Sequence, residues 1–140
     1  MGARALSEVS VGDVVGPVAV PVSRATLVGY ANASLDQNPI HQDEDFARSV
    51  GLPDVIAHGM WTLGAAGSVV SQWAGGAARV VEFGTRFTKP VVVPAGGADI
   101  VLTGMVKSVD AEARRAVVDV TVTAGGDKVL GRCVATVQLD

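Results

Sequence analysis

The sequence has little of what several common classes of protein require. Of its 140 residues, one is a cysteine and two are histidines, and aromatic residues make up 4%. Because Cys133 is alone, the chain can form no internal disulfide and no cysteine-based metal cluster. The net charge is −3 and no basic stripe is present, so the sequence lacks the electrostatic pattern of a nucleic-acid-binding protein.

Long apolar runs are missing as well. The longest, such as residues 91–93, fall far short of the roughly 20 residues that a membrane-spanning helix needs. The first residues, MGARALSEVSVGD, lack the apolar run of a signal peptide. We therefore expect a cytoplasmic protein without membrane insertion. An apolar content of 49% against 18% charged residues predicts a folded core, and the length predicts one domain over residues 1–140.

The first half of the sequence contains helical signals. Ser23 is typical of an N-cap, and residues 24–33 place their apolar side chains roughly on one helical face. Asp43 predicts the start of a second, short helix. Residues 57–74 (AHGMWTLGAAGSVVSQWA) form the longest apolar segment. We expect one buried helix there, with Gly75-Gly76 as its end.

The second half alternates apolar and polar residues with a period near two, which is typical of strands. Four such segments, separated by turn residues, predict an antiparallel meander: 79–88, 98–109, 116–123 and 128–139. Residues 9–13 predict an entry strand and a turn. The β-branched stretch 14–22 predicts a further strand, which Pro17 and Pro21 restrict to a sheet edge or an irregular piece. The predicted fold class is α+β, with a long sheet wrapped around the helix at 57–74.

Polar residues with acid–base capacity gather in one stretch, residues 30–60, which holds both histidines of the chain. Asp36, Asn38 and His41 lie within six positions. A continuous helix would turn Asp36 and His41 apart, because five residues exceed one turn of about 3.6. Pro39 opposes such a helix and favours a bend. We therefore expect the carboxylate and the imidazole to face one point, where they can polarise a water molecule.

This stretch resembles a known family. Residues 30–41 (YANASLDQNPIH) resemble the signature of R-specific enoyl-thioester hydratases, the MaoC-like branch of the hot-dog fold. Residues 57–60 (AHGM) resemble that family's second motif, at the start of its central helix. The resemblance covers essentially the whole chain and is closest to the B subunit of the actinobacterial (3R)-hydroxyacyl-ACP dehydratase. Leu35 stands where the family usually has glycine, a difference expected to change the turn or narrow the pocket.

The resemblance implies a hot-dog fold and reversible hydration of trans-2-enoyl thioesters to (3R)-3-hydroxyacyl thioesters, without a metal or redox cofactor. It implies Asp36 and His41 as the acid–base pair, and the backbone N–H of Gly59 as the donor to the thioester oxygen. Asn38 either orients Asp36 or the water, or forms the turn before Pro39. The substrate carrier is coenzyme A or acyl carrier protein, in fatty-acid or polyketide metabolism.

Three further residues are expected to bind substrate: His58, Arg86 and Lys89. His58 is expected to hold the helix entrance rather than to transfer protons. Arg86 and Lys89 are expected to meet the phosphates of coenzyme A or the acidic face of acyl carrier protein. His41 and His58 are potential zinc ligands, but the sequence offers no convincing third, so we expect no metal.

Two other functions stay open at this point. Thioesterases with the same fold use a carboxylate and water to cleave the thioester, and a non-catalytic subunit would shape the acyl tunnel of a partner. An antiparallel sheet also leaves an edge that favours pairing with another chain. The resemblance implies a dimer that pairs edge to edge, either a homodimer or a heterodimer with a second hot-dog subunit.

Overall fold

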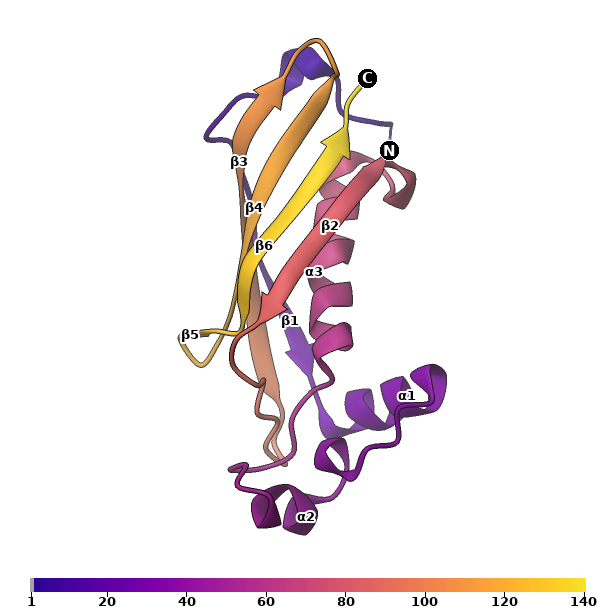
Figure 1. The fold of residues 1–140 in the computed structure, drawn as a ribbon, viewed down its shortest axis with the longest axis vertical. Helices are drawn as coiled ribbons and strands as arrows, with labels where there is room; N and C mark the ends of the chain where they lie inside the picture. Colours follow the sequence, from indigo (N-terminus) through magenta and orange to yellow (C-terminus); the bar gives the residue numbers. More distant parts are fainter. Residues whose placement is uncertain (1) are drawn as a thin grey trace.

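The fold is built from one antiparallel sheet and one long helix. The structure is a computed structural model that describes residues 2–140; Met1, the first residue of the predicted domain, lies outside the described residues. One face of the sheet packs against helix α3 (Gly59–Ala74), as Figure 1 shows. The predicted α+β class is confirmed.

Six strands form the sheet, in the order β1-β3-β4-β6-β2, with β5 paired to β4. Their bounds are β1 (Val14–Val22), β2 (Val80–Phe87), β3 (Ala98–Asp110), β4 (Arg115–Ala124), β5 (Asp127–Lys128) and β6 (Leu130–Gln138). The four long strands of the second half are therefore confirmed. β1 lies at an edge, as Pro17 and Pro21 predict, because proline cannot donate a hydrogen bond to a second neighbour.

The predicted meander is wrong in one respect. β3, β4 and β6 are consecutive neighbours, but β2 pairs with β6 at the far edge and not with β3. The connection from β2 to β3, residues 88–97, crosses from the β2 edge of the sheet toward the opposite edge, where β3 pairs with β1. It forms a bridge between Val92 and Ile56. Alternation with a period of two identifies a strand but not its partner, so the sequence pattern could not reveal this crossing.

The predicted entry strand at residues 9–13 is also wrong. A short 3-10 helix, η1 (Leu6–Glu8), precedes this stretch, and the stretch itself contains only the turn at Val11 and Gly12. Gly12 has a φ of 92°, which glycine adopts readily and which ends extended geometry. The first strand therefore begins only at Val14.

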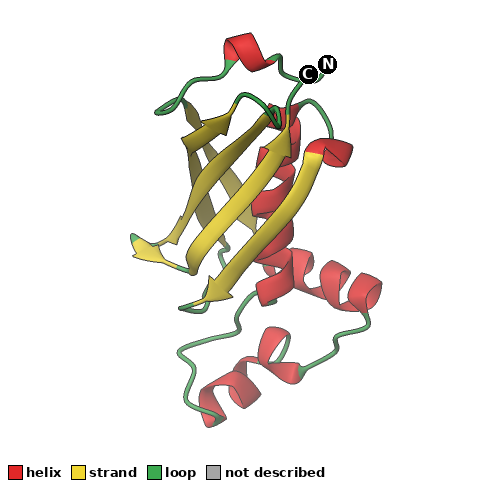
Figure 2. Cartoon of the chain, turned by 45° about the horizontal axis from the view of Figure 1, so that its top comes forward, coloured by secondary structure: helices red, strands yellow, loops and turns green. Residues whose placement is uncertain are grey.

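The helices of the first half follow the sequence signals. α1 (Arg24–Ser34) begins after Ser23, whose Oγ accepts from the Thr26 N–H at 3.1 Å, and α2 (Glu44–Ser49) begins after Asp43, whose Oδ1 accepts from the Phe46 N–H at 3.0 Å. Both lie beyond one end of the sheet, opposite the chain termini (Figures 1 and 2). Within residues 2–140, no helix has the length and apolar content to span a membrane.

The core fixes the place of α3. The side chains of Thr62, Ala66, Val70 and Ala74 are buried at a spacing of four, on the face that meets the sheet. Large aliphatic side chains of the sheet, such as Ile100 and Leu102, are fully buried, and each such burial contributes about 1.5–3 kcal/mol. α3 ends at Gly75, as predicted, but begins at Gly59, two residues later than predicted. The N-terminus of α3 thus points out of the core toward α1 (Figure 1).

Candidate active site

The loop between α1 and α2 holds Asp36 and Asn38 in place. The N–H of Asn38 donates to Oδ1 of Asp36 at 3.2 Å. Oδ1 of Asn38 accepts from the N–H of Ile40 at 3.2 Å, which caps the 3-10 helix η2 (Pro39–His41). The Asn38 side chain therefore forms the turn, one of the two roles predicted for it, and its backbone holds the Asp36 carboxylate.

Leu35 keeps the backbone geometry that glycine would have. As the C-cap of α1 it has a φ of 67°, in the left-handed region. Its side chain is 82% exposed and lines neither of the two cavities described below. The residue therefore does not narrow a pocket. Its difference from glycine lies in backbone strain, which costs about 1–2 kcal/mol for a residue with a Cβ.

His41 is buried and oriented by a backbone carbonyl. Its Nδ1 lies 2.6 Å from the carbonyl oxygen of Ile56. Since a carbonyl only accepts, Nδ1 carries the proton and Nε2 keeps a free lone pair. Burial lowers the pKa of His41 below the usual 6.5, and the nearby His58 lowers it further, while the Ile56 bond and the Asp36 charge oppose this. The ring is therefore neutral at pH 7.

His58 lies at the centre of the cluster, with 2% of its surface exposed. Its ring stacks on that of His41 with 3.7 Å between centroids and 23° between planes, and the ring of Tyr30 tilts against it at 4.7 Å. Nε2 lies 3.1 Å from the carbonyl oxygen of Asp36 and so carries the proton. Within residues 2–140, Nδ1 of His58 is the one buried side-chain nitrogen or oxygen without a hydrogen bond, which costs about 1–3 kcal/mol.

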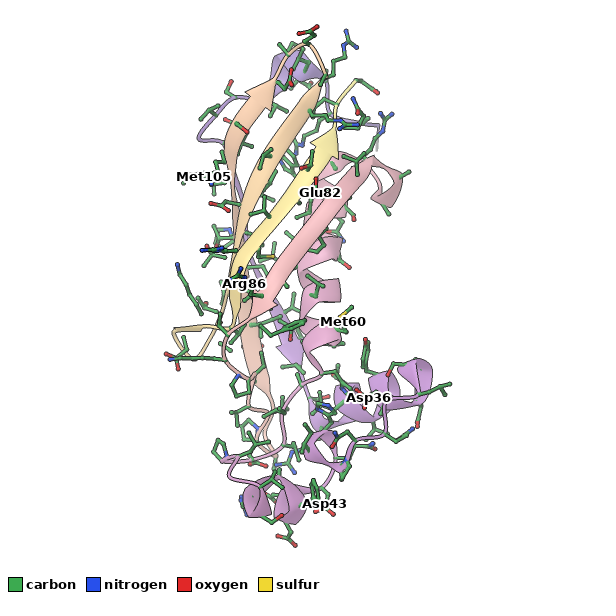
Figure 3. The ribbon with its side chains drawn as sticks, viewed as in Figure 1. Asp36, Asp43, Met60, Glu82, Arg86 and Met105 are labelled. Carbon is green, nitrogen blue, oxygen red and sulfur yellow. The ribbon has the colours of Figure 1, made fainter. Side chains whose placement is uncertain are left out.

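The structure thus brings Asp36 and His41 together, with His58 beside them. One nitrogen or oxygen atom from each of the three side chains lies within 4.8 Å of the others. Asp36 is exposed at the surface of this cluster, while both histidines are buried. Figure 3 places Asp36 near the first turn of α3, which carries Met60. A carboxylate and a neutral imidazole at this separation can hold one water molecule between them.

Asp36 lies close enough to His41 and His58 to be a third potential metal ligand. The geometry of the cluster can therefore be compared with that of a zinc site. The rings of His41 and His58 are stacked and nearly parallel. A metal ion lies in the plane of each imidazole that binds it, at about 2.0–2.1 Å from nitrogen. Two planes that diverge by 23° at this spacing do not meet so close to the rings. The arrangement therefore does not fit a zinc site.

Gly59, the first residue of α3, exposes the start of the helix. The first N–H groups of a helix have no partner within it, and His58, at the N-cap, makes no side-chain capping bond. No hydrogen bond joins the Gly59 N–H to another of residues 2–140. A Cβ atom on Gly59 would lie 2.9 Å from Cε1 of Phe87, so the close approach of that ring also requires glycine.

Two cavities adjoin the cluster. The first, of about 410 Å³, is mostly apolar and is lined by Ile56, Ala57, Gly59, Met60, Thr62, Phe87, Thr88, Lys89, Pro90, Val91, Val129 and Leu130. The second, of about 470 Å³, runs along α3 and β1 and includes Tyr30, Met60 and Trp61. Asp36 and His41 line neither, but Ile56 and Tyr30, which contact the two histidines, line one each. Met60, in the first turn of α3, lines both cavities.

The two predicted cations are placed differently. Lys89 lines the first cavity, and its Nζ lies 3.2 Å from Oδ1 of Asp127 in an exposed ion pair. Arg86 lies on β2, lines neither cavity, and is separated from Asp36 in Figure 3. The structure therefore brings Lys89 to the candidate site but not Arg86.

Three residues contribute to the site in ways that the sequence did not predict. Tyr30 begins the motif at residues 30–41, but the sequence indicates no contact between its ring and His58. The Ile56 carbonyl belongs to the backbone, which gives no signal in a residue type. Phe87 lies against Gly59, but nothing in either local sequence pairs them.

Comparison with known proteins agrees with this geometry. The family model described as MaoC like domain matches residues 8–127. The chain is 36% identical over 96 residues to 3-hydroxyacyl-thioester dehydratase X of Mycobacterium tuberculosis, covering 61% of this chain and 33% of that protein. It is 32% identical over 111 residues to 3-hydroxybutyryl-CoA dehydratase of Methylorubrum extorquens, covering 78% and 68%. The chain belongs to the MaoC-like domain family.

Solved structures confirm the fold. A protein described as a MaoC-like dehydratase superposes with a TM-score of 0.97 at 40% identity, over 99% of this chain and 43% of that one. The HadBC (3R-hydroxyacyl-ACP dehydratase) complex of Mycobacterium tuberculosis superposes with a TM-score of 0.67 at 21% identity, over 89% and 93%, which supports the fold alone. The sheet packed around α3 is therefore the hot-dog fold. The chain spans about a third of dehydratase X and less than half of the first structure.

Proposed function

We propose that this chain is a hydro-lyase that interconverts trans-2-enoyl and (3R)-3-hydroxyacyl thioesters. The observation that carries the proposal is the cluster of Asp36 and His41, with ligand atoms within 4.8 Å, beside the free first N–H of α3. An acid–base pair and an oxyanion donor are the two requirements of this reaction. The names of the relatives, dehydratases of 3-hydroxyacyl thioesters, support the same chemistry.

In the hydration direction, Nε2 of His41 accepts a proton from a water that Asp36 orients through a second hydrogen bond. The water oxygen bonds to C3 of the enoyl thioester, and the electron pair of the double bond moves to the thioester oxygen as an enolate. The Gly59 N–H and the positive end of α3 stabilise that charge. The imidazolium of His41 then returns the proton to C2. The sum is the addition of one water, so the step needs no redox cofactor.

The tautomer of His41 supports this division of roles. Because Nδ1 donates to the Ile56 carbonyl at 2.6 Å, only Nε2 is free to accept a proton. The lowered pKa of His41 keeps that nitrogen unprotonated at pH 7. Asp36 is exposed, and one of its oxygens is held by the Asn38 N–H, which leaves the other for the water.

The first cavity is proposed to take the acyl chain. It begins at Gly59, its walls are mostly aliphatic, and its volume of about 410 Å³ is within the usual range for small-molecule sites. Thr62, which is buried, also lines it from α3.

The carrier of the acyl group is proposed to be anionic: coenzyme A or acyl carrier protein. Lys107, Lys128 and Arg132 line a hollow of about 420 Å³ in which Asp119 is the acidic residue, and Arg86 pairs in register with Gly131 of the same hollow. Within residues 2–140, these four cations form no ion pair with an acidic side chain. Lys89 lines the first cavity and is paired with Asp127; we assign it to the carrier as a fifth cation. Unchanged KM values for both carriers after Arg86→Ala and Lys89→Ala would reject this assignment.

A second hot-dog domain is proposed as the partner. β2 forms an edge without proline, whereas Pro17 and Pro21 interrupt the β1 edge, so β2 is the better edge for pairing. The partner is a second copy or a different hot-dog subunit, as the greater length of several relatives supports. Sedimentation of the purified chain should give the mass of a dimer, or of a monomer that gains activity only with its partner. A cytoplasmic location stays a prediction.

The decisive experiment measures hydration of crotonyl thioester by enoyl absorbance. Asp36→Asn and His41→Gln should each lower turnover by about 100-fold or more, because acid–base groups contribute roughly 10²–10⁴-fold. Folded variants with near-normal hydration would overturn the proposal. Release of free thiol without a change in enoyl absorbance would instead indicate a thioesterase. The assay should be run with the chain alone and with a partner co-purified from the native host.

A further inference from the structure

His58 connects every part of the candidate site, although it lies outside the acid–base pair. Its ring contacts His41 by stacking and Tyr30 at an angle, and it bonds the Asp36 backbone. It is also the residue directly before Gly59. We propose, on the basis of the function proposed above, that His58 is a positioning residue that holds Asp36 and His41 in register with the N-terminus of α3.

Asp36 is tied to the helix side of the site through His58. Its other hydrogen bonds join residues only two positions away: its N–H donates to Oγ of Ser34 and its Oδ1 accepts from the Asn38 N–H, both at 3.2 Å. The bond from Nε2 of His58 to the Asp36 carbonyl, at 3.1 Å, spans 22 positions. Among residues 2–140 it is the one hydrogen bond that ties Asp36 to the helix side of the site.

The ring of His41 is held by two contacts. Stacking at 3.7 Å covers one face of its ring, and the Ile56 carbonyl fixes the direction of its Nδ1. Together these two contacts leave the ring no freedom to turn away from Asp36. The titratable groups that face His41 are Asp36 and His58; His58 lowers the pKa of His41, and the Asp36 charge raises it.

Histidine is not among the residues preferred at the N-cap of a helix, where His58 lies. Serine or aspartate is preferred at an N-cap, because its side chain binds the first free N–H groups of the helix. The His58 ring instead turns to Asp36 and leaves those N–H groups free for a ligand. Its Nδ1 stays buried without a partner, which costs about 1–3 kcal/mol.

Three variants separate the two contacts of the ring. His58→Gln keeps a donor at the place of Nε2, His58→Phe keeps the stacking surface, and His58→Ala loses both. We expect kcat for hydration to fall 10- to 100-fold in His58→Ala and His58→Phe with KM changed less than threefold. His58→Gln should recover at least part of that loss. The acid limb of the kcat/KM profile should shift to higher pH in His58→Ala, because His41 gains access to water.

A second measurement does not depend on activity. The chain has two histidines, so nitrogen NMR of the imidazoles resolves both, and His58→Phe leaves only the two ring nitrogens of His41. We expect opposite tautomers in the native protein, with the proton on Nδ1 of His41 and on Nε2 of His58. In His58→Ala, the pKa of His41 should rise. A native His58 protonated on Nδ1, or a His41 signal and pH profile unchanged by His58→Ala, would overturn the proposal. Absent hydration with the expected tautomers would overturn the proposed function instead.

Discussion

The Nδ1 atom of His41 lies 2.6 Å from the carbonyl oxygen of Ile56, fifteen positions along the chain. This bond joins the loop after α1 to the segment that leads into α3. The motif at residues 30–41 is therefore tied to the backbone just before the motif at residues 57–60. The same bond also decides which nitrogen of the ring can act as a base. The first two predictions follow from this environment of His41.

The activity of the protein should depend on the deprotonation of His41. Burial lowers the pKa of its ring below the usual 6.5, so Nε2 stays free to accept a proton down to below that pH. We expect kcat/KM for hydration to be level around pH 7 and to fall only at pH values lower than 6.5. A pH–rate profile checks this, with residual activity of His41→Gln as the control. An acid limb centred above pH 6.5 would contradict the environment described for this ring.

The stability of the fold should depend on the same group. Because the pKa of His41 is lower in the folded than in the unfolded chain, the unfolded chain binds more protons just below pH 6.5. The contribution of His41 is therefore fully present above about pH 6.5 and is lost as the pH falls toward the folded pKa. Its slope is at most about 1.4 kcal/mol per pH unit. Urea unfolding at several pH values checks this, and His41→Gln should show a weaker dependence over that range.

Gly59 offers a direct test of the oxyanion donor. Proline is tolerated at the first position of a helix, and His58 has extended backbone angles (φ −60°, ψ 134°) that suit a residue before proline. Gly59→Pro removes the N–H, whereas Gly59→Ala keeps it but adds the Cβ that meets Phe87. We expect Gly59→Pro to lose a further 10²- to 10³-fold in kcat relative to Gly59→Ala. Equal kcat values in folded samples of both variants would show that this N–H is not the donor.

Leu35 should be a site where stability is easily gained. Its φ of 67° costs about 1–2 kcal/mol for a residue with a Cβ, and glycine avoids this cost but loses about 0.5–1 kcal/mol through its freer unfolded chain. We expect Leu35→Gly to raise the free energy of unfolding by about 0.5–1 kcal/mol, since little burial is lost. Leu35→Ala, which keeps the Cβ, should not, and a gain as large in that control would point to a cause other than backbone strain.

Much of the fold could be predicted because local signals agree with it. Ser23 and Asp43 cap the helices that they predict, and the apolar segment that ends at Gly75 is the central helix. The pairing of β2 with β6 could not be predicted, because a strand pattern does not name its partner. The entry strand predicted at residues 9–13 does not form, because the turn at Gly12 ends a short run of alternating apolar and polar residues.

The site was predictable where it depends on residue types within one short loop. Asp36 and His41 come together around Pro39, as the bend implies. The stacking of His41 on His58 depends on the path of the 16 residues between them, whose shape no local pattern sets. The carbonyl of Ile56 and the ring of Phe87 enter the site through backbone position and packing, so their roles follow only from coordinates.

The bridge between Ile56 and Val92 lies outside the sheet, and two bonds hold it: the Ala57 N–H to the Val91 carbonyl and the Val93 N–H to the Val55 carbonyl, both at 2.9 Å. The segment between Asp36 and His58 is therefore joined to residues 91–93 by a short bridge of main chain rather than by a strand of the sheet. A segment held by so few main-chain bonds can open locally while the sheet and α3 stay folded. Mild heat or denaturant should therefore abolish activity before the sheet unfolds. Amide exchange at Ala57 and Val93 should be faster than exchange within β4.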